Sequence, residues 1–145
     1  MKPPPTSLPP PPVLLYDGLC ALCNRSVRWL IRHDRRRHVR FAALAGETAA
    51  AILARHPELA GADTVVFVEA AGSPAERVLV LSAAALAALR QGGLFWRFLA
   101  GVATLVPRPI RDAAYRFVAR RRYRRFGRYE TCPLPPPAER ERFLP

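Results

Sequence analysis

The sequence predicts an α/β domain, and three observations support that class. Short apolar runs rich in valine, leucine and phenylalanine recur in the first 81 residues, as expected for buried strands. The first two of these runs are each followed by a stretch whose apolar residues have helical spacing. At 145 residues the chain is also long enough to form one domain with a hydrophobic core.

The first strand and helix flank the most informative motif of the chain. Residues 13–16 are all apolar or aromatic and indicate a strand. Asp17 and Gly18 follow as a turn pair, and then come Cys20 and Cys23, two residues apart. Beyond them, apolar and polar residues occupy opposite arcs of a helical wheel, namely Cys23, Val27, Leu30 and Ile31 against Asn24, Arg25, Arg28 and Arg32. We therefore expect Cys20 to be exposed at the start of a helix and Cys23 to face inward.

The remaining elements are expected in the order strand 39–44, helix 46–56, strands 64–68 and 77–81, and helix 82–89. Pro57 ends the second helix, and the turn Gly72-Ser73-Pro74 indicates a hairpin between the last two strands. Ser82 is expected to cap the third helix, which Gly92 and Gly93 end. The predicted order βαβαββα is that of a thioredoxin-like fold, and a helical C-terminal extension is expected from about residue 94.

The two ends of the chain are predicted to lie outside this domain, which is expected to span residues 13–134. Residues 1–12 are rich in proline, which lacks a backbone donor and restricts its neighbours, so we expect a disordered tail. A run of prolines after Cys132 predicts a second tail over residues 135–145. The N-terminal tail lacks the apolar region of a signal peptide, so a cytoplasmic location is expected.

The helical extension contains an apolar stretch and a basic stretch. Residues 94–106 are too few to span a membrane, which takes about 20 apolar residues, and Arg97 interrupts them. We expect a helix packed on the core and no stable membrane insertion. Residues 108–128 are rich in arginine, and their aromatic residues have a spacing that favours a buried stripe with a solvated arginine face: Tyr115, Phe117, Tyr123 and Phe126.

The two thiols predict redox chemistry. A cysteine at a helix N-terminus meets unpaired backbone N–H groups and the positive end of the helix dipole, which favours its thiolate. We therefore predict a thiol-disulfide oxidoreductase in which Cys20 attacks a protein or small-molecule disulfide and Cys23 resolves the mixed disulfide. No organic cofactor or metal is expected. Asp17 has two interpretations: it accepts or relays the proton of the resolving thiol, or it holds the loop by accepting backbone N–H bonds.

Other interpretations of the cysteines carry less support. Structural zinc takes four ligands, but Cys132 is the only further cysteine, and His33, His38 and His56 lack ligand spacing. A structural disulfide between near neighbours would constrain little of the chain. Two ordinary buried cysteines remain an alternative, and Cys132 is either a third redox thiol or a passive one.

The charge of the chain suggests a function of another class. With 23 Lys+Arg against 11 Asp+Glu, the net charge is +12, which predicts solubility and weak, non-specific attraction to anions. The alternative function is therefore a non-catalytic binding module that uses the basic C-terminal helix on nucleic acid or an anionic membrane. A binding module has no need for paired thiols, whereas an oxidoreductase has no need for the arginine-rich helix.

The chain resembles the DCC family of thioredoxin-like thiol-disulfide oxidoreductases. The Asp and two Cys of that family's first loop are matched by Asp17, Cys20 and Cys23. Further similar positions are Asn24-Arg25, Ser82, Asp112-Ala113-Ala114-Tyr115 and Arg122-Tyr123-Arg124-Arg125-Phe126-Gly127. The resemblance covers about residues 13–134 and implies a thioredoxin-like fold with protein-disulfide oxidoreductase activity.

Overall fold

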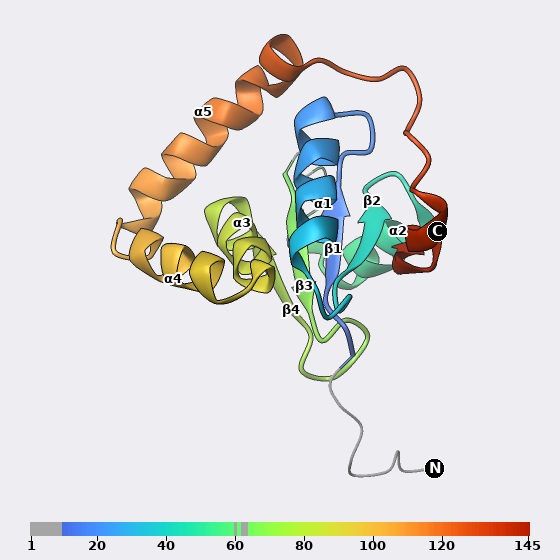
Figure 1. The fold of residues 1–145 in the computed structure, drawn as a ribbon, viewed down its shortest axis with the longest axis horizontal. Coiled ribbons are helices and arrows are strands. Elements are labelled where there is room, and N and C mark those ends of the chain that lie inside the picture. Colours follow the sequence, from blue (N-terminus) through green and yellow to red (C-terminus); the bar gives the residue numbers. More distant parts are fainter. Residues whose placement is uncertain (1–9, 60, 62–63) are drawn as a thin grey trace.

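The structure is a computed structural model that describes residues 10–59, 61 and 64–145, in which helices surround a mixed sheet (Figure 1). Most of the expected N-terminal tail, residues 1–9, lies outside the described residues. The strands are β1 (Val13–Tyr16), β2 (Arg40–Ala43), β3 (Val66–Glu69), β4 (Arg77–Val80) and β5 (Phe143–Leu144). The α-helices are α1 (Ala21–His33), α2 (Glu47–Arg55), α3 (Leu81–Leu89), α4 (Leu94–Ala103) and α5 (Arg108–Phe126).

The sheet has the strand order β4-β3-β1-β2-β5. β1 pairs in parallel with β2, in a register that sets Leu14 opposite Phe41. β3 is antiparallel to both β1 and β4. A parallel pair joined by a helix, followed by an antiparallel hairpin and a helix, is the predicted βαβαββα order, so the thioredoxin-like fold is confirmed.

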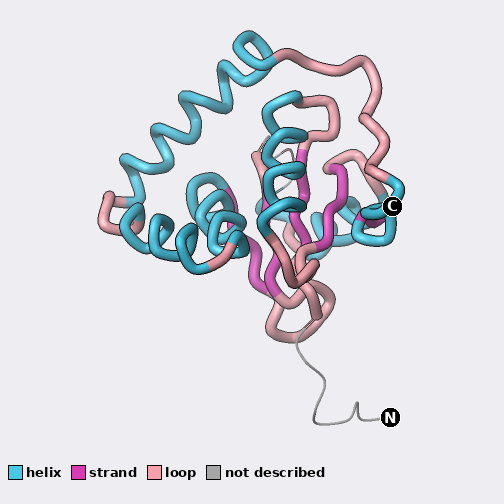
Figure 2. Tube along the Cα trace, in the orientation of Figure 1, coloured by secondary structure: helices cyan, strands magenta, loops and turns pink. Residues whose placement is uncertain are grey.

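Both faces of the sheet are covered, because alternate residues of each strand point to opposite sides. Leu14 and Tyr16 of β1 belong to a core with residues of α1 and α3. Val13 and Leu15 belong to a second core with residues of α2. Figure 2 shows the corresponding layers, with helices on either side of the strands. The loop between β1 and α1 emerges at the carboxyl end of the central strand β1.

The predicted C-terminal tail is wrong, because residues 137–144 complete the domain. After the 3-10 helix η3 (Pro137–Arg142), the two residues of β5 pair in parallel with β2. Arg142 is buried, and its Nη2 donates to Asp34 Oδ2 at 2.7 Å while its Nε donates to the Val39 carbonyl at 3.2 Å. The prolines prevent regular structure only in their own segment, and the chain beyond them returns to the sheet edge.

The helices α4 and α5 form the extension that the sequence predicts. α4 packs inward through Trp96, whose ring meets Trp29 of α1 edge to face at a centroid distance of 4.9 Å, and through buried Ala100. α5 is tied to β3 by the Tyr115 hydroxyl, which accepts the Val65 N–H at 3.0 Å. Within the described residues, none of the helices is both long and apolar enough to cross a membrane.

Two expectations about the helices are wrong, one about α3 and one about α5. Ser82 does not cap α3, whose N-cap is Val80; its hydroxyl instead donates to Asp112 of α5. The aromatic residues of α5 do not form a buried stripe, since Phe117, Tyr123 and Phe126 are exposed. The reason is that α5 touches α1 and α3 along one side only, and an arginine rather than an aromatic residue, Arg122, is its buried side chain.

Candidate functional site

The two cysteines lie at the N-terminus of α1, as the sequence predicts. Cys20 is the N-cap residue, and its Sγ accepts the backbone N–H of Cys23 at 3.3 Å. The sulfur thus occupies the position at which a serine or aspartate oxygen satisfies the first free N–H groups of a helix. A negative charge is stabilised at this position by the helix dipole. The Cys20 sulfur is therefore a hydrogen-bond acceptor at the N-terminus of α1.

Contrary to the expectation for Cys20, both cysteines are buried. Cys20 has 0% and Cys23 8% of its surface exposed. Cys20 is covered by residues 127–129, which follow α5 and which we call the covering segment. Its Gly127 carbonyl accepts the Ala21 N–H at 3.2 Å, its Tyr129 N–H donates to the Leu19 carbonyl at 2.7 Å, and Arg128 forms an antiparallel bridge with Cys20.

The Cys23 thiol has a raised pKa. Burial, followed by a hydrogen bond to Cys20 and the charge of that neighbour, raises the pKa of Cys23 to about 12. The positive charge of Arg122 acts in the opposite direction and lowers the pKa of Cys23. Cys23 therefore holds its proton and donates a hydrogen bond to Cys20. In this pair, the Cys20 sulfur at the N-terminus of α1 is the hydrogen-bond acceptor, and the Cys23 thiol, one turn further along the helix, is the donor.

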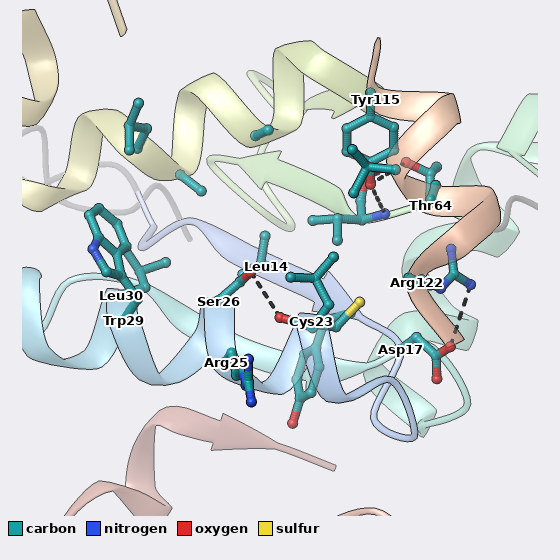
Figure 3. A pocket seen from close by; sticks show the side chains of 18 of the residues that line it. Leu14, Asp17, Cys23, Arg25, Ser26, Trp29, Leu30, Thr64, Tyr115 and Arg122 are labelled. Carbon is teal, nitrogen blue, oxygen red and sulfur yellow. Dashed lines mark hydrogen bonds and ion pairs between the residues drawn. The ribbon is translucent and has the colours of Figure 1, made fainter. Parts of the chain in front are cut away.

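Asp17 holds the loop before α1 and joins it to α5. Its Oδ1 accepts the Leu19 N–H at 3.0 Å, the backbone contact expected of a turn aspartate. Its Oδ2 accepts the Tyr123 hydroxyl and lies 3.5 Å from Nη2 of Arg122, an ion pair visible in Figure 3. These contacts correspond to the loop-holding interpretation of Asp17.

The sequence analysis missed two polar residues of the site. Asn24, assigned to the polar arc of α1, is buried, and its Nδ2 donates to the carbonyls of Gly18 and Cys20 at 2.8 and 2.9 Å. Its place one turn after Cys20 is a signal that could have revealed this role. Arg122 had no such signal, because only the packing of α5 brings it to Asp17 and Cys23.

Cys132 lies against the same loop. Its Sγ is so close to Gly18 that a Cβ added there would stand 2.6 Å from the sulfur, so a side chain at this position would displace Cys132. Burial and a hydrogen bond to Cys132, together with the charge of Cys23, raise the pKa of Tyr16. Tyr16 is thus close to the thiols of Cys132 and Cys23. Cys132 itself is exposed.

An apolar pocket of about 530 Å³ opens beside Cys23, between α1, α3 and α5 (Figure 3). Its walls include Leu22, Trp29, Leu30, Val65, Ala85, Ala88, Leu89 and Val118. Cys23 contributes to the wall at the end where Asp17 and Arg122 meet, and Arg25 lies on the α1 side. The volume is in the range of pockets that bind small organic molecules or a few side chains. Among the described residues, no three His, Cys, Asp or Glu side chains gather in a metal-ligating group.

The comparisons with known proteins agree with this site. The family model of DCC1-like thiol-disulfide oxidoreductases matches residues 14–128. The chain is 36% identical over 134 residues to the uncharacterized protein YuxK of Bacillus subtilis, covering 92% of this chain and 93% of that protein. It is also 36% identical over 124 residues to a chloroplastic DCC family protein of Arabidopsis thaliana, covering 85% and 69% of the two chains. No solved structure matches significantly. The chain therefore belongs to the DCC1-like thiol-disulfide oxidoreductase family.

Proposed function

We propose that the protein catalyses thiol-disulfide exchange, with Cys20 as the attacking thiol and Cys23 as the resolving thiol. The observation that carries the proposal is the asymmetry of the pair. Cys20 Sγ accepts the Cys23 N–H at the start of α1, whereas the pKa of Cys23 is raised to about 12. Cys23 thus keeps its proton, and Cys20, whose sulfur lies at the helix N-terminus, is the thiol placed to attack.

The reaction proceeds in two exchanges. The Cys20 thiolate attacks one sulfur of the substrate disulfide, whose S–S bond breaks, and the departing sulfur takes a proton. Cys23 then loses its proton and attacks Cys20, which releases the second substrate sulfur as a thiol. The substrate gains two electrons and two protons, and the enzyme is left with a Cys20–Cys23 disulfide. A thiol reductant restores the dithiol by the reverse steps.

Access to Cys20 is part of the proposal. Cys20 is fully buried and the covering segment is bound to the backbone on either side of it, so we propose that exchange with a protein disulfide requires residues 127–129 to move away from the loop. The two hydrogen bonds that hold the segment are few enough for such local opening. The apolar pocket beside Cys23 then receives the apolar group next to the substrate disulfide.

Asp17 and Arg122 position the resolving thiol in this proposal. Arg122 lowers the pKa of Cys23, which helps that thiol to lose its proton in the second exchange. Asp17 neutralises part of this charge and fixes the loop through Leu19. The alternative role of Asp17 as a proton relay predicts that resolution slows when its carboxylate is removed, whereas the positioning role predicts a shifted pKa of Cys23.

The test is equilibration of the protein in glutathione buffers, with the disulfide fraction read by mass spectrometry. Ala21 and Leu22 between the cysteines supply no cation or hydrogen-bond donor from a side chain, so we expect a weak oxidant with a potential of roughly −270 to −200 mV. A potential near about −120 mV would replace the reductase assignment with that of a strong oxidant. Absence of a Cys20–Cys23 disulfide at every ratio would overturn the proposal.

A further inference from the structure

The outer face of α4 is apolar and has no partner within the described chain. Leu94, Phe95, Phe98 and Val102 fall within about one third of the helical wheel, because α-helical residues advance by about 100° each. Leu105, in the turn after α4, and Ile110, in the first turn of α5, are two further exposed apolar side chains of the same arm. The six side chains are between 46% and 85% exposed, and we call them the apolar patch.

This exposure is not explained by the packing of α4 on the domain. The opposite face of the helix already makes that contact, through Trp96 against Trp29 and through buried Ala100. The helix is therefore apolar on both faces, a pattern found in helices that are covered on both sides. Exposed apolar clusters of this kind mark interaction surfaces in soluble domains. α4 lies at the outer edge of the molecule, away from β2 and β5 (Figure 1).

The surroundings of the patch are strongly basic. Between residues 77 and 129 the sequence contains twelve arginines and a single carboxylate, Asp112. That carboxylate is already engaged, since it accepts the Ser82 hydroxyl and lies 3.6 Å from Arg108. Arg97 lies within α4 itself and is exposed. The arm formed by α4 and α5 therefore combines exposed apolar side chains with a large excess of positive charge.

We propose that the apolar patch docks the protein on the surface of an anionic phospholipid bilayer. In such a contact, leucine and phenylalanine side chains enter the boundary between headgroups and acyl chains, while arginines meet the lipid phosphates. The contact is peripheral, since no described helix can cross a membrane. It concerns a surface separate from the thiols and does not depend on the proposed exchange reaction.

Charge and chemistry favour this partner over two others. A second copy of the chain would bring two arginine-rich arms together, and at a net charge of +12 these arms repel each other. Nucleic acid would meet the arginines and could stack on Phe95 and Phe98, but it offers nothing to Leu94, Leu105 or Ile110. A bilayer accommodates both the aliphatic side chains and the charges.

The test is co-sedimentation of the full chain with vesicles of phosphatidylcholine alone or mixed with phosphatidylglycerol, at low and physiological salt. We expect binding to the mixed vesicles that weakens but persists at physiological salt, because the apolar contribution is not screened. The double variant Phe95→Ser/Phe98→Ser should bind at least about tenfold more weakly, since each phenylalanine loses its apolar burial. Leu134→Ser is the matched control: Leu134 is as exposed as Leu94, at 85%, but lies outside the patch.

A second measurement reports insertion directly. In a Phe98→Trp variant, brominated acyl chains in the mixed vesicles should quench the added fluorescence above the level seen with wild-type protein. Three results would overturn the proposal. The first is binding that vanishes at physiological salt and is unchanged in Phe95→Ser/Phe98→Ser. The second is single-stranded nucleic acid binding that survives this salt and requires both phenylalanines. The third is a dimer in vesicle-free solution that the same double variant abolishes.

Discussion

Asp17, in the loop before α1, and Arg122, near the C-terminal end of α5, form an ion pair with an N–O distance of 3.5 Å. The pair links the loop that carries the cysteines to a helix near the other end of the chain. Arg122 also lowers the pKa of Cys23, so the carboxylate of Asp17 and the thiol of Cys23 share the influence of one buried guanidinium.

Removing Asp17 and removing Arg122 should shift the pKa of Cys23 in opposite directions. Asp17→Asn removes a carboxylate that offsets part of the charge of Arg122, so the pKa of Cys23 should fall. Arg122→Met removes the cation, so the same pKa should rise. Thiolate absorbance of a Cys20→Ser/Cys132→Ser background, titrated with pH, measures both shifts. Unchanged titration curves would show that Arg122 does not act on Cys23.

The roles of the two thiols can be separated by trapping. With Cys132 replaced by serine in both variants, Cys23→Ser should accumulate a mixed disulfide with a protein substrate such as insulin, because no further thiol resolves the bond to Cys20. Cys20→Ser should form none at the same pH, since the pKa of Cys23 is raised to about 12. Non-reducing electrophoresis and mass spectrometry detect the adduct. Equal trapping by both variants would contradict the assigned roles.

The covering segment should control the reactivity of Cys20. Tyr129→Pro removes the N–H that donates to Leu19, a hydrogen bond worth about 1 kcal/mol, so opening should become about fivefold more frequent. We expect Cys20 to be alkylated faster by about that factor in a Cys23→Ser/Cys132→Ser background. Tyr129→Phe keeps the N–H and serves as the control. The same alkylation rate in both variants would mean that the segment does not limit access.

Alkaline pH should destabilise the reduced protein through Cys23. Its pKa is about 12 in the folded protein and about 8.5 in an unfolded chain, so the folded state binds more protons between these values. The free energy of unfolding therefore falls as pH rises above about 9, by at most about 1.4 kcal/mol per pH unit for this group. Urea unfolding at pH 8, 9 and 10 under reducing conditions measures the slope. The free energy of unfolding of Cys23→Ala should fall less steeply with pH. An equal slope in the variant and the wild type would contradict the raised pKa of Cys23.

The buried ion pair between Asp34 and Arg142 should contribute strongly to stability. Arg142→Met leaves the Asp34 carboxylate buried without its cation, a change that costs about 3–5 kcal/mol of unfolding free energy. Adding Asp34→Asn should recover part of the loss. Arg140→Met, at an exposed position of the same 3-10 helix, should change stability by less than about 0.5 kcal/mol. Urea denaturation of the four proteins gives the comparison.

The sequence predicts those parts of the structure that depend on local pattern. The apolar run 13–16, the wheel of α1 and the spacing of Cys20 and Cys23 define the strand, the helix and the thiol pair, and all three are present. What the sequence could not reveal depends on contacts between distant segments. Cys20 is buried in the core and bridged by Arg128, and the role of Arg122 comes from the packing of α5. Neither contact leaves a periodic signal.

The pairing of β5 with β2 has a consequence for the order in which the chain acquires its structure during synthesis. Arg142 contacts Val39, 103 residues earlier, so this sheet edge closes only after nearly all of α5 and the segment beyond it have left the ribosome. Until then β2 is an open edge that could pair with a strand of another nascent chain. The two residues of β5 end that exposure, and their docking buries Arg142 at the same moment. A substitution that weakens this last step should therefore lower the yield of soluble protein more than its effect on equilibrium stability would suggest.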